Sequence, residues 1–141
     1  ITHKQMTRFH ITLQEGVDFV LLSLSKMYGG EIFIPKLDSI KITDIAKAVD
    51  KNKKIKIVGL REGEKIHEDM ITENESLHTI VYKNYFVIAS QSKFLKYPIH
   101  KIAKLTKGHI SKKSFKYSSN SENKYLNINQ IAREIKYLDK K

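Results

Sequence analysis

The sequence predicts a mixed α/β fold in which short helices alternate with short strands. Residues 12–28 repeat apolar side chains at spacings of three and four, which is typical of one face of a helix. Four later runs, residues 31–35, 54–59, 77–82 and 85–89, are rich in β-branched or aromatic side chains, which favours strands. With 141 residues, 40% of them hydrophobic, the chain suffices for one modest core or for part of a larger domain.

The first expected helix has a start signal and a stop signal. Thr12 and Glu15 form a capping-box pattern, in which each side chain bonds a backbone N–H that the first turn leaves unpaired. Gly29 and Gly30 supply the positive φ angles that end a helix after Tyr28. The apolar stripe of this helix consists of Leu13, Val17, Val20, Leu21 and Leu24.

Capping residues also indicate two further helices. Thr43 is expected to cap a short second helix. Asn127 is expected to cap the last helix, with Gln130 three residues later completing the capping pattern. Residues 118–121, which precede that helix, are expected to be the most loop-like stretch of the chain. The apolar face of the last helix is formed by Ile128, Ile131, Ile135 and Leu138.

The strand predictions depend on burial and turn chemistry. Residues 31–35 alternate poorly, so we expect a strand buried on both faces there. Residues 54–59 alternate as a strand that leads into a charged turn. Lys83 and Asn84 are expected to join the two strands of a hairpin, because Asn tolerates a positive φ. Residues 91–121 lose any clear pattern and are expected to be irregular.

The formal charge of +11 suggests a nucleic-acid partner, but the distribution of the charge argues against one. Only three of the 26 basic residues are arginine, the side chain best suited to bidentate contacts with phosphates and bases. The others are lysines scattered along the chain, which indicates a solvated surface. The three arginines are Arg8, Arg61 and Arg133.

Several classes are excluded by what the sequence lacks. There is no cysteine for disulfides or metal-thiolate sites, and the six histidines show no metal-ligand spacing with a carboxylate partner. No apolar run approaches the ~20 residues of a membrane-spanning helix. Ile1 begins no secretory signal, and we expect the chain to be a fragment or a processed piece. No strand leads into a G-x-G-x-x-G loop, so the chain is not a complete dinucleotide-binding enzyme.

A dense charged turn over residues 59–68 is the first candidate binding site. It follows the apolar run of residues 54–59, and such a turn places Arg61 where its guanidinium reaches a bound anion. Gly63 allows the backbone to bend closely around that anion. The alternative is a solvated turn whose charged side chains pair with one another.

Two other clusters carry polar side chains of interest. Thr7 and Arg8 precede the first helix, where a hydroxyl and a guanidinium can grip a phosphate. Glu64, His67 and Glu68 offer acid–base chemistry in principle, but the sequence shows neither a partner nor a substrate pose for a general base.

Four motifs, in order and spacing, resemble a known family. They are Met6-Thr7-Arg8-Phe9, Gly29 to Lys36, Ile42 to Ala46 and Gly59 to Glu68. Together they resemble the UDP-N-acetylglucosamine 4,6-dehydratases (inverting) of the extended short-chain dehydrogenase/reductase superfamily, which make sugars for flagellin pseudaminic acid, capsule and lipopolysaccharide. The tail Tyr117 to Asn120 and the later Leu126 resemble the C-terminal extension of that family.

The resemblance implies a division of the chain and of the chemistry. Residues 1–90 are expected to be the substrate-binding part of the extended Rossmann-type fold, and residues 91–141 the C-terminal extension. In this family NADP takes a hydride from C4 of the sugar, water is eliminated across C5 and C6, and the hydride returns at C6 with inversion at C5. The catalytic groups and the NADP-binding loop belong to an N-terminal part, so this chain is expected to hold no catalytic and no cofactor-binding residue.

The same resemblance assigns the substrate contacts. Arg61 is expected to contact the UDP pyrophosphate, with Arg8 as a second cation on the opposite wall. Thr7 and Asn120 are expected to help hold the nucleotide sugar, and Glu64 to orient Arg61 or to meet the ligand.

The implied protein is a cytoplasmic homo-oligomer with a UDP-sugar as its partner, without nucleic acid and without a membrane span. A UDP-sugar 4-epimerase of the same superfamily is an alternative, because it shares the fold, the cofactor and the two arginines. A lysine-rich module that binds polyanions is another, and it predicts strong salt dependence. A mere truncation product would expose the apolar stripe of its first helix.

Overall fold

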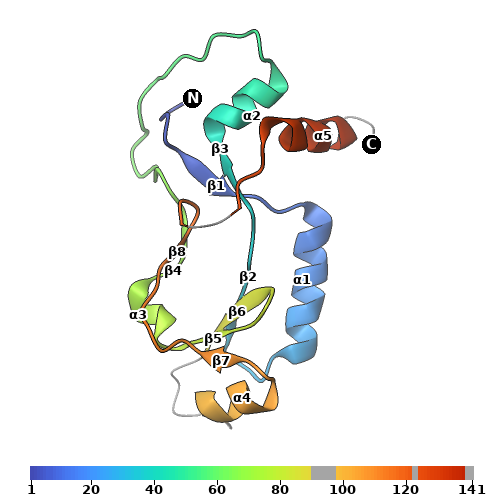
Figure 1. The fold of residues 1–141 in the computed structure, drawn as a ribbon, viewed down its shortest axis with the longest axis vertical. Coiled ribbons are helices and arrows are strands. Elements are labelled where there is room, and N and C mark those ends of the chain that lie inside the picture. Colours follow the sequence, from blue (N-terminus) through green and yellow to red (C-terminus); the bar gives the residue numbers. More distant parts are fainter. Residues whose placement is uncertain (90–97, 122–123, 139–141) are drawn as a thin grey trace. The chain divides into compact units, whose positions relative to one another are not determined.

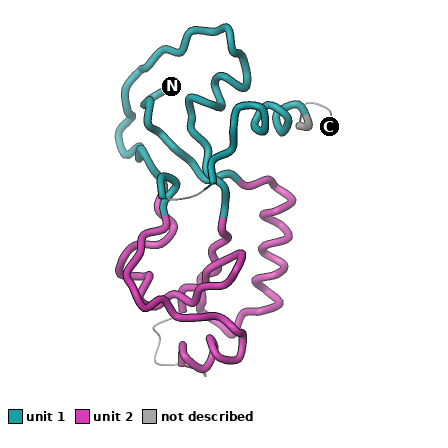
Figure 2. The backbone as a smooth tube through the Cα atoms, in the orientation of Figure 1, with its two compact units in different colours: residues 1–10, 37–68, 118–141 teal, residues 11–36, 69–117 magenta. Residues whose placement is uncertain are grey.

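The computed structural model describes residues 1–89, 98–121 and 124–138. The chain divides into two units, each assembled from segments that are far apart in the sequence (Figure 2). Unit 1 comprises residues 1–10, 37–68 and 118–141, and unit 2 comprises residues 11–36 and 69–117. The expected division of the family modules at residue 90 concerns the sequence and stays a prediction.

Unit 1 is built on a two-stranded antiparallel sheet and two helices (Figure 1). Strand β1 (Thr7–Phe9) pairs with β3 (Ser39–Lys41), and helix α2 (Ile42–Val49) follows β3 directly. Helix α5 (Ile128–Leu138) packs on α2. The core consists of Ile40, Leu126 and Ile131, with Ile45, Ala48 and Ile135 packed against them.

The caps of the two helices in unit 1 differ in how well they were predicted. The cap of α5 is confirmed: the Asn127 N–H donates to Gln130 Oε1 at 2.9 Å, and the Gln130 N–H donates to Asn127 Oδ1 at 3.0 Å. The predicted cap of α2 is wrong, because β3 runs straight into a helix that already begins at Ile42. Its N-cap residue is Lys41, which makes no side-chain capping bond.

Residues 54–59 form no strand, which corrects the prediction made from their alternation. The residues are exposed, and two backbone bonds tie them to the start of the chain: the Ile1 amino group donates to the Lys56 carbonyl at 2.9 Å, and the Val58 N–H donates to the Ile1 carbonyl at 3.0 Å. A ladder needs a partner strand of several residues. Arg61 therefore does not lie at the end of a strand.

Unit 2 contains a four-stranded antiparallel sheet in the order β2-β6-β5-β7 (Figure 1). Its core is formed by Ile80 and Val87 of the sheet with Ile102 and Ala103 of helix α4, which packs on it. The bounds of these elements are β2 (Ile32–Pro35), β5 (Thr79–Val81), β6 (Tyr85–Ile88), α4 (Ile99–Leu105) and β7 (His109–Ile110).

The predicted β5–β6 hairpin is confirmed, but the reason given for its turn is wrong. Among the described residues other than glycine, only Lys107 has a positive φ, at 57°, so Asn84 does not. Position 108, which follows Lys107, requires glycine for lack of space and not because of its φ angle. A Cβ on Gly108 would lie 2.4 Å from Cγ2 of Ile80, inside the core of unit 2.

Helix α1 (Leu13–Lys26) has the predicted Thr12–Glu15 capping box. Gly29 and Gly30 have the predicted positive φ angles, 122° and 80°, but they do not end the helix, which stops at Lys26 with the extended residue Met27 as its C-cap. The apolar stripe of α1 is nevertheless exposed: Leu13 is 87%, Val20 57% and Leu24 62% accessible, and Val17 and Leu21 are exposed as well. Periodicity locates such a face but does not supply a partner for it.

The expectation that β2 is buried on both faces is wrong for Ile32, which is 57% exposed, although Ile34 is buried. Among the strands that the structure describes, β2 lies at the edge of its sheet and pairs with β6 alone. An edge strand has one neighbour fewer to cover its side chains.

The expected irregular stretch over residues 91–121 also contains regular structure. Besides α4 and β7 it holds β8 (Tyr117–Ser118), which pairs with β4 (Asp69–Ile71). Residues 90–97 lie outside the described part of the chain. The prediction also missed α3 (Glu73–Ser76), a single turn with a complete capping box. No helix among the described residues is long and apolar enough to cross a membrane.

Candidate functional site

The candidate site in unit 1 centres on a closed turn from Arg61 to Glu64. The Glu64 N–H donates to the Arg61 carbonyl at 3.1 Å, and the Arg61 N–H donates to Glu64 Oε2 at 3.0 Å. Gly63 has a φ of 74°, which the third position of a type II turn requires. The Thr2 hydroxyl donates to Glu64 Oε1 at 3.0 Å, so both carboxylate oxygens of Glu64 hold the turn.

Arg61 itself keeps its charged group available. The side chain is exposed, and its guanidinium makes no hydrogen bond or salt bridge with any residue in the described ranges. The backbone on which it stands is fixed by Glu64 and by Thr2. A guanidinium on a fixed turn loses little backbone freedom when it binds an anion.

The charge of Glu64 is stabilised by its surroundings. The Arg61 N–H, and after it the Thr2 hydroxyl and the charges of Arg61 and Arg8, lower the pKa of Glu64, although partial burial acts in the opposite direction. Glu64 therefore carries a carboxylate at neutral pH and serves as an acceptor. Because both Arg61 and Arg8 act on this pKa, the two predicted cations share Glu64 as an electrostatic neighbour.

The guanidinium of Arg8, in β1, donates hydrogen bonds to backbone carbonyls of the chain itself. Nη1 donates to the carbonyls of Thr7 at 2.7 Å and Ile66 at 3.1 Å, and Nη2 donates to the carbonyl of Lys65 at 2.9 Å. Nε lies 3.6 Å from Glu68 Oε1, and the side chain is 24% exposed. Arg8 thus ties β1 to the segment that follows the Arg61–Glu64 turn.

Thr7 and Ser119 form a buried hydroxyl pair that the sequence analysis missed. Their oxygens are 2.7 Å apart, and Thr7 Oγ1 also lies 2.8 Å from Nδ1 of His67. Ser119 is fully buried, and its Oγ accepts a hydrogen bond from the Glu68 N–H at 2.9 Å. No local pattern reveals a contact between residues 112 positions apart in the sequence.

The loop predicted at residues 118–121 contains a turn after Ser118, but its first two serines are buried. Ser118 is 1% exposed, because its hydroxyl lies 2.9 Å from the Glu68 carbonyl and 2.8 Å from Asn120 Oδ1. The Ser119 N–H donates to the same carbonyl at 2.8 Å. A serine-rich segment can be buried when the chain satisfies its hydroxyls in this way. Asn120 remains exposed beside them.

The structure brings the predicted residues together to different degrees. Thr7, Arg8, Arg61, Glu64 and Asn120 all belong to unit 1. Arg61 and Glu64 contact each other directly. Thr7 and Arg8 instead contact residues 66 and 67, which follow the Arg61–Glu64 turn along the chain. The alternative acid–base cluster is not assembled, because Glu64 and Glu68 make no hydrogen bond to each other or to His67. His67 bonds Thr7 instead, and Glu68 accepts from the Phe9 N–H at 3.1 Å.

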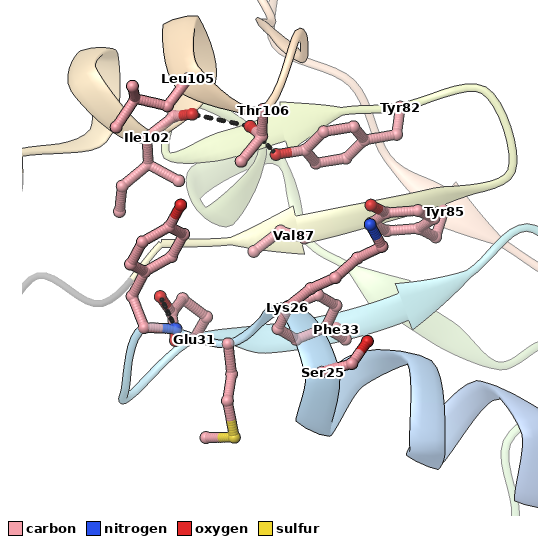
Figure 3. A pocket seen from close by; sticks show the side chains of 12 residues that line it. Ser25, Lys26, Glu31, Phe33, Tyr82, Tyr85, Val87, Ile102, Leu105 and Thr106 are labelled. Atoms are coloured by element: carbon pink, nitrogen blue, oxygen red, sulfur yellow. Dashed lines mark hydrogen bonds between the residues drawn. The ribbon is translucent and has the colours of Figure 1, made fainter.

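Unit 2 contains a separate cavity of about 440 Å³ between the end of α1, the sheet and α4 (Figure 3). The rings of Tyr82 and Tyr85 stack in its wall with centroids 4.5 Å apart. Two of its polar side chains are already bonded: the Tyr82 hydroxyl lies 2.5 Å from Thr106 Oγ1, and the Glu31 carboxylate accepts the N–H groups of Tyr28 and Gly29. None of the five predicted site residues lines this cavity.

Metal ligation has no visible support in the part of the chain that the structure describes. Among those residues no three His, Cys, Asp or Glu side chains gather closely enough to hold a metal ion.

Comparison with known proteins places the chain in a family. The family model of the polysaccharide biosynthesis proteins matches residues 1–90, which include β1 and the Arg61–Glu64 turn. The chain belongs to this family. The match is consistent with the resemblance inferred from the four motifs.

Named relatives of this family agree with that resemblance. The chain is 40% identical over 143 residues to a UDP-N-acetylglucosamine 4,6-dehydratase (inverting) of Campylobacter jejuni subsp. jejuni, a match that covers 99% of this chain and 42% of the relative. A UDP-glucose 4-epimerase of Rickettsia massiliae is 32% identical over 101 residues, which is 69% of this chain and 30% of that enzyme. The chain therefore spans less than half the length of either relative.

The mixed α/β fold is confirmed by a solved structure. Pen from Bacillus thuringiensis superimposes with a TM-score of 0.75 at 24% sequence identity, over 99% of this chain and 40% of Pen. At this identity the likeness establishes the fold alone.

Proposed function

We propose that this chain is the nucleotide-sugar-binding part of an inverting UDP-N-acetylglucosamine 4,6-dehydratase that makes 6-deoxy-4-keto amino sugars for bacterial surface glycans or flagellin. The family match and the Campylobacter relative support the reaction class. The observation that carries the binding role is the Arg61 guanidinium, which stands unpaired among the described residues on a turn locked by Glu64.

A UDP diphosphate is the ligand group that this turn suits. A guanidinium presents a planar fork that matches phosphate oxygens, and a charge-assisted hydrogen bond is about twice as strong as a neutral one. Arg8 would add a second positive charge to the site, which its contribution to the lowered pKa of Glu64 supports. Thr7 and Asn120 complete the proposed contact set, Thr7 from the buried hydroxyl pair and Asn120 from the exposed end of the serine turn.

The redox chemistry belongs to NADP, which, when bound, would accept a hydride from the sugar and return it later. The residues of this chain do not fit that cofactor, because the sequence contains no G-x-G-x-x-G loop. We therefore assign NADP and the catalytic groups to other parts of a cytoplasmic, homo-oligomeric enzyme. The task of this chain is to hold the diphosphate so that the sugar is presented to those groups.

A UDP-sugar 4-epimerase is the second candidate, and the Rickettsia relative favours it. Both relatives are named for a UDP-linked sugar, so a site for the UDP diphosphate at the Arg61 turn would serve either enzyme. The products differ, because dehydration removes one water and epimerisation does not.

Product analysis of the native protein tests the proposal. Incubated with NADP and UDP-N-acetylglucosamine, it is expected to yield a UDP-linked keto sugar one water lighter than the substrate, as measured by mass spectrometry. A product of unchanged mass with altered C4 configuration, read by NMR, would establish the epimerase. If neither product forms and the protein binds heparin but not UDP, the polyanion-binding alternative replaces both.

A further inference from the structure

In unit 1, hydrogen bonds link Ser119, Thr7 and His67 in a row. The buried residue Ser119 determines which group donates and which accepts along this row. The Glu68 backbone N–H can only donate, so at 2.9 Å it occupies an acceptor position of Ser119 Oγ. The only other contact of that hydroxyl with described residues is Thr7 Oγ1, 2.7 Å away. Ser119 is fully buried, so its proton has Thr7 Oγ1 as its acceptor.

The same direction continues through Thr7 to the imidazole. Thr7 Oγ1, which accepts from Ser119, donates its own proton to His67 Nδ1 at 2.8 Å. Thr7 is 4% exposed, so water does not readily take that proton. The reverse direction would leave the Ser119 proton buried without an acceptor, which is unfavourable.

The consequence for His67 is a defined tautomer. A neutral imidazole whose Nδ1 accepts a hydrogen bond carries its proton on Nε2. Nε2 has no hydrogen-bond partner within the described ranges, and the His67 side chain is partly exposed. The ring therefore exposes its Nε2–H as a donor, while Nδ1 accepts the hydrogen bond from Thr7.

The position of His67 connects this donor to the Arg61 turn. The preceding residue, Ile66, gives its carbonyl both to Arg8 Nη1 at 3.1 Å and to the Thr7 N–H at 3.1 Å. Glu64, three residues before His67, closes the turn that carries Arg61. The segment between the two candidate donors is thus held at several points.

Resting on the proposed function, we propose that His67 is a further ligand-binding residue of this site, donating its Nε2–H to an anionic oxygen of the nucleotide-sugar diphosphate. Toward His67, Thr7 and Ser119 act as positioning residues, because their hydroxyls set the tautomer of the imidazole. Arg61 supplies the positive charge, and His67 supplies a directed N–H donor.

Two amide substitutions test the roles of the two ring nitrogens separately. His67→Asn retains a polar group near the Nδ1 position and removes the outer donor, whereas His67→Gln retains an outer amide and removes the inner acceptor. We expect His67→Asn to weaken UDP binding about tenfold, the equivalent of one hydrogen bond to a charged group, with little change in melting temperature. We expect His67→Gln to keep UDP affinity within about threefold while lowering the melting temperature. His78→Asn, at an exposed histidine of unit 2, is the matched control.

The tautomer is measured directly by ¹⁵N NMR of the imidazole at pH 8. Nε2 is expected to be the protonated nitrogen in the wild-type protein, Thr7→Val to mix the two tautomers, and Thr7→Ser to restore the wild-type signal. A protonated Nδ1 in the wild-type protein, or wild-type UDP affinity in His67→Asn, would overturn the proposal. If the wild-type protein binds no UDP, the proposed function fails with it, and the NMR experiment still decides the direction of the chain.

Discussion

Strand β1 and the Arg61–Glu64 turn each carry an arginine, and the two arginines are used in opposite ways. Arg8 donates to three backbone carbonyls and lies near Glu68, whereas Arg61 makes no side-chain bond within the described structure. The position of Arg61 is instead fixed by hydrogen bonds between its backbone and Glu64. Arg8 therefore stabilises the structure around the site, whereas the guanidinium of Arg61 is available to bind a ligand.

The largest expected effect comes from removing the arginine of β1. Arg8→Ala removes one donor from each of three carbonyls, and we expect a loss of about 2–3 kcal/mol in the free energy of unfolding, discounted for partial exposure. Urea denaturation followed by circular dichroism measures it. Arg133→Ala, at an exposed arginine of α5, is the matched control. Wild-type stability in Arg8→Ala, combined with lost UDP binding, would make Arg8 a direct ligand contact and break the contrast.

A smaller effect is expected from the backbone of the turn. Gly63→Ala places a Cβ at a φ of 74°, which costs about 1 kcal/mol, and the distorted turn should weaken UDP binding. Gly16→Ala is the matched control, because Gly16 lies inside α1 and a Cβ there meets only Ile11 Cδ1 at 4.0 Å. That control is expected to stabilise the protein by about 0.5–1 kcal/mol. Equal effects of the two substitutions on UDP affinity would show that the turn geometry is irrelevant.

The smallest effect concerns the charge of Glu64. Its pKa is lowered in the folded state, so its stabilising contribution is present above the ordinary value of 4.5 and is lost as the pH falls through the lowered pKa. The Arg61 amide resonance should therefore shift only below about pH 4.5 in the wild-type protein. Glu64→Gln, which retains an acceptor oxygen, should remove this acid transition. A transition that persists in Glu64→Gln would assign it to another group.

Sequence reading succeeded where the cause of a structure is local. The boxes at Thr12–Glu15 and Asn127–Gln130 lie within single helical turns, and the β5–β6 hairpin joins adjacent runs. Each of these structures is specified by residues that are close along the chain.

The failures depend on partners that lie far away in the sequence. Residues 54–59 alternate like a strand, but their hydrogen bonds within the described ranges go to Ile1 at the start of the chain and form no ladder. Ser119 is buried because of Thr7 and Glu68, which are 112 and 51 residues away. The composition of a segment does not reveal such contacts. For the same reason the motif Thr7-Arg8 indicated a phosphate grip but could not show that the guanidinium of Arg8 reaches the carbonyls of Lys65 and Ile66.

The most direct test of the central claim is a calorimetric titration of UDP into the wild-type protein, Arg61→Ala and Arg133→Ala. The account predicts that Arg61→Ala binds UDP at least tenfold more weakly, because a charge-assisted contact is lost, while its melting temperature stays at the wild-type value. Arg133→Ala should bind like the wild type, because it removes the same charge elsewhere in unit 1. Equal UDP affinity in all three proteins would contradict the assignment of the Arg61 turn as the diphosphate site.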